Sequence, residues 1–277
     1  MVETNGGAFG EFSQAWTRGL ILFAVIMLLN TKMRFLKKIE KKDWKWFLII
    51  ATAGGLNQAP YFLGFEHLTI GTATMLFYAA LVVGGYILGK IFFKEKMTSV
   101  KILSLVIAIL GMLLIYGFSL TSSQFFPASM TILAGLMGAS AIILSKKLIG
   151  NYHELQIMVG YFALQVIFNW PLAWIMNDPI PVIAINPAWL GQLGYATAMI
   201  LANMAVITGF KYLEASIGSL IGLAEILFGV AFGMILFGES LGMGVIAGGI
   251  CIVVAAALPS LIELDKFRLR RAMSPQA

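Results

Sequence analysis

The sequence predicts an all-α fold, a polytopic membrane helix bundle made of two inverted repeats. Hydrophobic residues make up 60% of the chain and charged residues 12%, against roughly 45–50% and about 25% in soluble domains. Apolar runs of about 20 residues, long enough to cross a bilayer as helices, recur along the whole chain. One of these runs, at 64–95, has a partner of similar pattern at 209–239. The lipid bilayer is therefore the expected solvent of this protein.

The partner stretches match position by position. Gly64 pairs with Gly209, Leu68 with Leu213, Gly85 and Gly89 with Gly229 and Gly233, and Glu95 with Glu239, at offsets of 145 or 144. Internal repeats of this kind are typical of secondary transporters.

Apolar runs bounded by charge, glycine, proline or polar clusters predict nine spans. Their expected bounds are 12–30, 44–65, 69–92, 99–118, 128–146, 152–177, 188–210, 215–237 and 240–262.

The charges predict how these spans are oriented. Six Lys/Arg follow the first span, and four more follow the last. Positive residues gather on the cytoplasmic side of membrane proteins, so both segments are expected there, with a cytoplasmic C-terminus. Threading the nine spans then places 18 of the 19 Lys/Arg on that side, Arg18 being the exception. The same threading sends 69–92 and 215–237 across the membrane in opposite directions, so the repeats are inverted.

An inverted pair requires an odd number of spans in each unit. The second unit, 128–262, has five predicted spans, whereas the first, 1–118, has four, and 263–277 is a basic cytoplasmic tail. We therefore expect the first unit to lack its first helix relative to a ten-helix parent. Truncation and a natural nine-helix form are the two explanations.

Several stretches carry a family resemblance. They are Arg18 early in a helix, GFEHLTIGTATMLFYAAL at 64–81, and above all GLAEILFGVAFGMILFGE at 222–239 followed by GVIAGGICIVVAA at 244–256. They resemble the EamA-type transporters of the drug/metabolite transporter superfamily. The resemblance implies a ten-helix inverted repeat with a central substrate cavity that moves small metabolites, often outward. It does not name a substrate, because one fold serves many.

Glu225 is the acidic residue nearest the middle of a predicted span, about eleven residues from either end. An unpaired charge at that depth costs roughly 2.5–3.5 kcal/mol on insertion scales. Burial favours the neutral form of a carboxyl, so protonation would compensate, as would partners on neighbouring helices. Two interpretations stay open: a site that senses protons or substrate, and a neutral acid that ties two helices together.

A polar stripe marks the span 44–65. Gly54, Asn57, Gln58 and Tyr61 fall at i, i+3, i+4 and i+7 beside Pro60, which places them on one helix face. Asn203 lies 145 residues after Gln58 on the matching span. These amides are expected to line a shared cavity and bind substrate. The alternative is hydrogen bonding between helices without substrate.

Tyr78 stands near the position that corresponds to Glu225 in the other repeat, whose direct counterpart is Ala80. The sequence therefore predicts an asymmetric site, with the acid from one half and aromatic rings from the other. Plain packing is the alternative for Tyr78.

Other functional classes are disfavoured. A single cysteine and two distant histidines provide no metal site, and we expect no cofactor and no catalytic residues. The net charge of +6 lies beside apolar runs, which favours contact with anionic headgroups over nucleic acid. We therefore predict a secondary-active carrier in the plasma (inner) membrane, an exporter of a small metabolite driven by a substrate or proton gradient. A non-transporting membrane fragment and a membrane-embedded enzyme are the alternatives.

Overall fold

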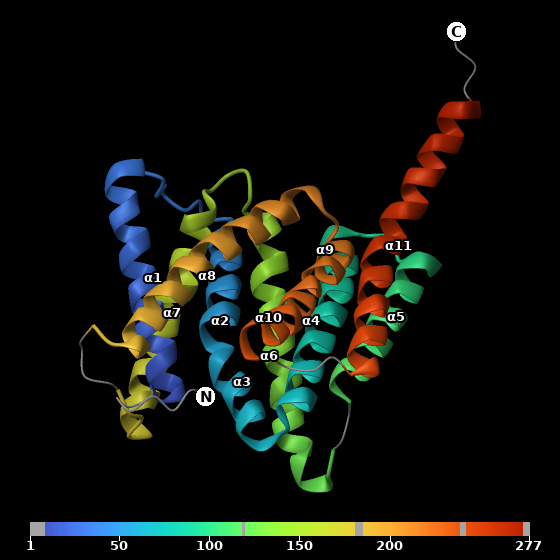
Figure 1. The fold of residues 1–277 in the computed structure, drawn as a ribbon. Helices are drawn as coiled ribbons and strands as arrows, with labels where there is room; N and C mark the ends of the chain where they lie inside the picture. Colours follow the sequence, from blue (N-terminus) through green and yellow to red (C-terminus); the bar gives the residue numbers. More distant parts are fainter. Residues whose placement is uncertain (1–8, 118–119, 181–184, 239–241, 274–277) are drawn as a thin grey trace.

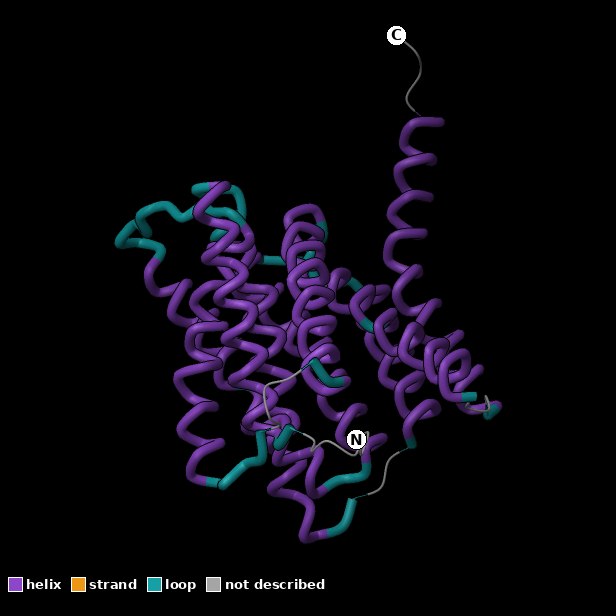
Figure 2. Tube along the Cα trace, turned by 60° about the vertical axis from the view of Figure 1, so that its left-hand side comes forward, coloured by secondary structure: helices purple, strands orange, loops and turns teal. Residues whose placement is uncertain are grey.

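The structure is a computed structural model that describes residues 9–117, 120–180, 185–238 and 242–273. It is a bundle of helices joined by short loops (Figures 1 and 2), which confirms the all-α membrane fold. The first half contains α1 (Glu11–Met33), α2 (Trp44–Leu56), α3 (Gln58–His67), α4 (Ile70–Phe93) and α5 (Ser99–Tyr116). The second half contains α6 (Phe125–Leu144), α7 (Glu154–Ile175), α8 (Pro187–Tyr212), α9 (Ala215–Gly222), α10 (Ala224–Phe237) and α11 (Met243–Met273), with short 3₁₀ helices η1 (Ser122–Gln124) and η2 (Ser145–Lys147) around α6.

Eight helical segments within the described residues, one of them formed by α9 and α10 together, are long and apolar enough to cross a membrane. They match eight of the nine predicted spans, although the predicted start of 240–262 lies partly outside the described residues. The C-terminal helix α11 continues well past the predicted end at 262 and projects from the bundle (Figure 1).

The ninth predicted span, 44–65, is not one helix. It is divided into α2 and α3 at Asn57. Pro60 explains the break, because its ring clashes with the carbonyl four residues earlier, that of Leu56, where α2 ends. The expectation of one continuous helix over this span was therefore wrong: Gly54 lies in α2, Asn57 at the break, and Gln58 and Tyr61 in α3.

The predicted span 215–237 is also divided, into α9 and α10 at Leu223. The Leu223 N–H donates to Leu220 and the Ile226 N–H donates to Leu223, so both bonds span three residues and tighten the turn. Gly222, directly before the break, is a poor helix former by about 1 kcal/mol relative to alanine. Glu225 is therefore in the first turn of α10, and its expected place in the middle of an unbroken helix was wrong.

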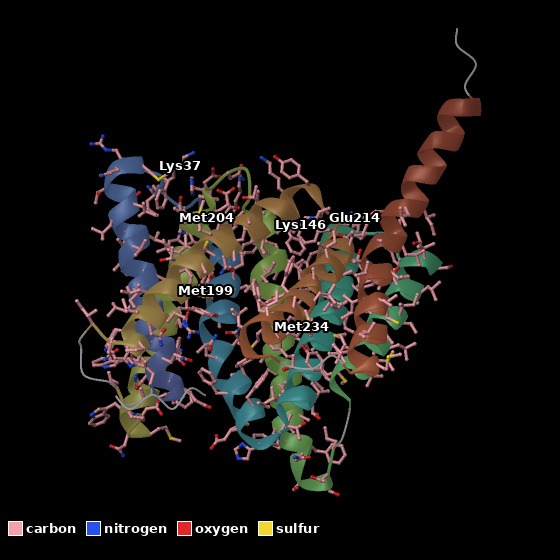
Figure 3. All side chains as sticks on the ribbon, viewed as in Figure 1. Lys37, Lys146, Met199, Met204, Glu214 and Met234 are labelled. Carbon is pink, nitrogen blue, oxygen red and sulfur yellow. The ribbon has the colours of Figure 1, made fainter. Side chains whose placement is uncertain are left out.

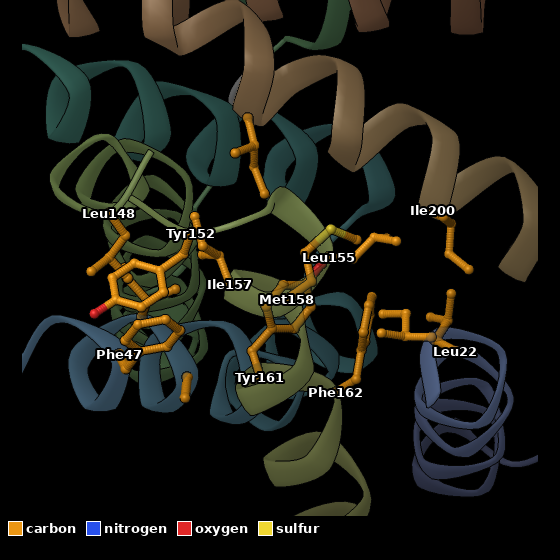
Figure 4. Close-up of a cluster of buried hydrophobic side chains, with 14 of the residues drawn as sticks. Leu22, Phe47, Leu148, Tyr152, Leu155, Ile157, Met158, Tyr161, Phe162 and Ile200 are labelled. Carbon is orange, nitrogen blue, oxygen red and sulfur yellow. The ribbon is translucent and has the colours of Figure 1, made fainter. Parts of the chain in front are cut away.

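Helices in equivalent positions of the two halves pack on each other. Helix α1 lies against α7, α5 against α11, and α4 against α9. Figure 1 shows the first pair on the left side of the bundle and the second pair on the right side. The largest buried cluster joins α1, α2, α7 and α8 through side chains that include Leu22, Phe47, Met158, Phe162 and Ile200 (Figure 4).

Glycines set the closest helix contacts. A Cβ at Gly111 of α5 would lie 2.8 Å from the carbonyl oxygen of Gly248 in α11, and one at Gly135 of α6 would lie 2.3 Å from that of Phe77 in α4. Both positions require glycine because backbone, which cannot rotate away, occupies the space.

Candidate functional site

The candidate site is a cavity of about 400 Å³ between α3, α4, α5 and α10. It is lined by Tyr61, Phe65, Thr74, Phe77, Tyr78, Tyr116, Glu225, Ile226, Gly229 and Val230. Phe65 is near the end of α3, Thr74 near the start of α4, and Tyr116 is the last residue of α5. The cavity therefore extends from the helix break beside Glu225 toward one end of the bundle. The lysines that terminate several helices lie at the opposite end, which we call the lysine-rich end.

Glu225 supplies the negative charge of this cavity. It is the second residue of α10 and is exposed to the cavity. The first backbone N–H groups of a helix have no partner within it, and the helix dipole favours an anion at that end. The break at Leu223 thus places Glu225 in the first turn of a helix at mid-span, which the sequence pattern had not shown.

Aromatic side chains surround the carboxylate. The Tyr78 hydroxyl is within hydrogen-bonding reach of Glu225, and Tyr61 and Tyr116 line the same cavity. The Phe77 ring contacts Tyr61 at 5.2 Å and Tyr78 at 5.3 Å between centroids, both edge to face. Three adjacent rings from α3 and α4 therefore form one wall, so the structure brings Tyr61, Tyr78 and Glu225 together.

The side-chain amides of Asn57, Gln58 and Asn203 are placed differently from the cavity residues Tyr61, Tyr78 and Glu225. Gln58 Nε2 donates to Asn57 Oδ1 at 3.4 Å, beside the break between α2 and α3. Asn203 Nδ2 donates to the Met199 carbonyl of its own helix at 2.8 Å. None of the three is among the residues that line the cavity. Gln58 and Asn203 thus form their hydrogen bonds within their own halves of the chain.

Arg18 of α1 contacts two side chains of α8. Its Nε donates to Gln192 Oε1 at 3.3 Å, and its guanidinium carbon lies 3.7 Å from the centroid of the Tyr195 ring. Gln192 and Tyr195 lie one turn apart on α8 and were not predicted as site residues; their spacing of three residues was the available signal.

A second polar cluster joins the two halves at the lysine-rich end of the bundle. The Glu95 carboxylate accepts hydrogen bonds from the Ala215 and Ser216 backbone N–H groups and from Ser216 Oγ, the last two at 3.1 and 2.7 Å. Buried Lys101 pairs with Glu214, and Lys146 Nζ donates to the Leu213 carbonyl. Figure 3 shows Lys146 and Glu214 at this end. We call Glu95, Lys101, Lys146 and residues 213–216 the inter-repeat cluster.

The described residues contain no group of three His, Cys, Asp or Glu side chains that could hold a metal ion. His67 and His153 lie on α3 and just before α7, and each is 3.9 Å or less from a neighbouring glutamate. The cavity therefore offers aromatic rings, hydroxyl groups and one carboxylate for binding a small molecule.

Comparisons with known proteins fit this architecture. The chain is similar to the pseudopaline exporter CntI of Pseudomonas aeruginosa, with 24% identity over 219 residues that cover 78% of this chain and 75% of the exporter. The protein of the same name from a second strain of that species is 23% identical over the same shares. A crystal structure described only as that of a protein aligns with a TM-score of 0.77 and 14% identity, over 97% of this chain and 91% of the solved chain. That likeness shows the fold alone.

The family comparison covers most of the chain. The EamA-like transporter family matches twice, at residues 12–117 and 126–261. These two matches divide the chain at the loop before α6, where the described helices also fall into two halves. This integral, multi-pass membrane protein therefore belongs to the EamA-like transporter family.

Proposed function

We propose that this protein is a secondary-active exporter of a small metabolite, and that it works by alternating access around the cavity beside Glu225. It acts in the plasma (inner) membrane with its lysine-rich end and C-terminus in the cytoplasm. In this scheme the units are those expected from the sequence, 1–118 and 128–262, followed by the tail at 263–277.

The observation that carries the proposal is the relation between the cavity and the inter-repeat cluster. The cavity reaches from mid-span toward the lysine-poor end. At the other end, Glu95 and Lys101 of the first half hold residues 214–216 at the start of α9. A cavity that is open toward one end and closed by polar contacts at the other is the arrangement an alternating-access carrier needs in one of its two states.

The energy source follows from what the chain contains. The sequence has no GxxxxGK[ST] loop, so direct use of ATP is disfavoured. A carrier without ATP uses the gradient of its substrate or of protons. Glu225 is the group that we assign to proton or substrate binding, because its carboxyl group lines the cavity together with Tyr78, Tyr61 and Tyr116.

The outward direction is supported by the relatives named as exporters. Because these relatives are only 24% and 23% identical to this chain, we do not assign their substrate to it. Asn57, Gln58 and Asn203 stay in the proposal as residues that bind substrate when the helices rearrange, while Tyr61, Tyr78 and Glu225 contact it in the state described here.

The test is transport by the purified chain in proteoliposomes. A thermal-shift screen of metabolites in detergent first identifies a ligand, and its uptake is then measured across a range of external pH. We expect Glu225→Gln to insert normally but to lose transport or its pH dependence, because the amide keeps the size of the side chain and cannot exchange a proton. The matched control is Glu40→Gln, an exposed glutamate paired with Lys42 outside the cavity.

Unchanged rate and pH profile in Glu225→Gln would leave Glu225 as a structural tie. Failure of the wild-type chain to transport any ligand that it binds would favour the non-transporting alternative.

A further inference from the structure

A second cavity, of about 320 Å³, lies between the first turns of α1 and the end of α7. It is lined by Trp16, Trp170, Ala173, Trp174, Asn177, Asp178 and Ile180. The two cavities share no lining residue. Figure 1 shows these ends of α1 and α7 at the lower left of the bundle. The second cavity is therefore a separate feature, and the proposed carrier gives it no role.

The turn that ends α7 fixes Asp178 beside this cavity. Asn177 has a left-handed backbone, with φ of 50°, and its N–H donates to the Trp174 carbonyl at 3.2 Å. The Asp178 N–H donates to the Ala173 carbonyl at 2.8 Å. These two bonds form the Schellman motif, whose left-handed position suits glycine or asparagine. The Asp178 carboxylate then reaches α1, where its Oδ2 accepts the Ser13 N–H at 2.8 Å.

Asp178 gives this cavity a negative charge. The four ion pairs among the described residues do not involve it. The Ser13 N–H occupies Oδ2, so Oδ1 is the oxygen that is left to accept from a ligand. Glu11 at the start of α1 and Glu66 near the end of α3 add negative charge to the same end of the bundle. The last turn of a helix also favours a cation. The cavity therefore matches a positively charged group.

Tryptophan rings form most of the cavity wall. Trp170 and Trp174 are four residues apart on α7, so they lie on one face of the helix, and Trp16 comes from α1. Trp170 is 59% exposed and Trp174 is 79% exposed. The face of an indole ring attracts an ammonium group more strongly than other aromatic side chains do. Tryptophan also gathers at the level of the lipid head groups. Rings and a carboxylate thus meet where an ammonium head group lies.

We propose that this cavity binds a phospholipid whose head group carries an ammonium. The ammonium lies against the tryptophan rings and donates a hydrogen bond to Asp178. The acyl chains run along the exposed side of α7, where Ile167 is 58% exposed one turn before Trp170. This apolar surface favours a lipid over a soluble amine, and the charge of Asp178 disfavours an anionic lipid.

The test measures lipid binding to the purified full chain in detergent by native mass spectrometry. The probe is dioleoyl phosphatidylethanolamine. It is compared with its N-acetyl derivative, which keeps the phosphate and both chains but lacks the ammonium group. We expect the unmodified lipid to bind about fivefold or more tightly, because it alone combines a charge-assisted hydrogen bond with the ring contacts. Free ethanolamine is the third probe and should bind more weakly than the lipid, because it lacks the acyl chains.

Two variants locate the site. Asp178→Asn removes the charge and keeps an oxygen that accepts the Ser13 N–H. Trp174→Leu removes one ring at an exposed position, so it keeps the test decisive if Asp178→Asn is unstable. Each variant should reduce the preference for the unmodified lipid by about twofold or more. The matched control is Trp44→Leu at the start of α2, where the tryptophan is 57% exposed at the lysine-rich end. This control should keep the full preference.

The proposal is overturned if the wild type binds both lipids equally, or if ethanolamine binds as tightly as the lipid. It is also overturned if either variant keeps the wild-type preference while remaining folded. That last result would leave Asp178 as a cap for α1 and the tryptophans as anchors at the membrane interface without a bound head group. Neither result depends on transport, so the proposed function is tested separately.

Discussion

The Glu95 carboxylate accepts hydrogen bonds from the backbone N–H and the hydroxyl of Ser216, at 3.1 and 2.7 Å, although the two residues are 121 positions apart. Glu95 follows the end of α4 in the first half, and Ser216 is in the first turn of α9 in the second. A carboxylate at a helix N-terminus satisfies N–H groups that the helix itself leaves unpaired. This contact ties the two halves at the lysine-rich end. In the alternating-access scheme that we propose, its strength would help to set how often that end opens.

Replacing Glu95 should therefore open the lysine-rich end. Glu95→Gln removes the charge that binds the first turn of α9, a loss of about 1 kcal/mol. With Cys251 replaced by serine, a cysteine at Ser219, which is 2% exposed, reports access. A membrane-impermeant thiol reagent on the lysine-rich side should label it about fivefold faster in the variant. Equal labelling in Glu95→Gln and in the control Glu40→Gln would show that Glu95 does not hold this end closed.

The two members of the Lys101–Glu214 pair should respond unequally to mutation. The Lys101 side chain is 5% exposed, whereas that of Glu214 is 44% exposed. Lys101→Met keeps the apolar stem and leaves a carboxylate that water can solvate, so we expect a loss of about 1 kcal/mol or less. Glu214→Ala leaves a buried ammonium without its partner and should cost about 2–3 kcal/mol. Thermal unfolding of both variants in one detergent measures the difference, and equal losses would contradict the reasoning.

The contact between α5 and α11 should tolerate no side chain at Gly111. A Cβ there would lie 2.8 Å from the Gly248 carbonyl oxygen. Since backbone occupies the space, Gly111→Val should force the helices apart and cost about 1–3 kcal/mol or more. The matched control is Gly191→Ala in α8, where nothing lies within 4 Å of an added Cβ. That change should be neutral or stabilising by up to about 1 kcal/mol. If the unfolding curves of the two variants shift by the same amount, close backbone contact at Gly111 is not the cause of the loss.

The expected topology can be tested with single cysteines. Ser122 in η1 and Ser99 at the start of α5 are both exposed and lie at opposite ends of α5. In a background without Cys251, a cysteine at position 122 should be labelled from outside the cell, and one at position 99 only after the cytoplasmic side is made accessible. Labelling of both from one side would refute the inverted arrangement of the repeats.

Some features of the site could be predicted from local sequence because their energetics are local. Apolar runs identify spans by the length and hydropathy of one segment at a time, and matched glycines and glutamates reveal the repeat. Glu225 could be singled out in the same way, as a carboxyl in an apolar run. Tyr78 could be placed near it through the offset between the repeats. These features depend on neighbours along the chain, so a single sequence is enough to indicate them.

Tertiary structure decided which of these side chains meet. The sequence alone did not show that the helix would break at Leu223 and set Glu225 at the N-terminus of α10. The amides of Gln58 and Asn203 looked equivalent by offset, yet their hydrogen bonds go to different neighbours. The contacts of Arg18 with Gln192 and of Glu95 with Ser216 join residues 174 and 121 positions apart. Each helix inserts into the membrane because of its own hydropathy. The charged groups that a side chain contacts depend instead on the rotation and depth of helices from the other half.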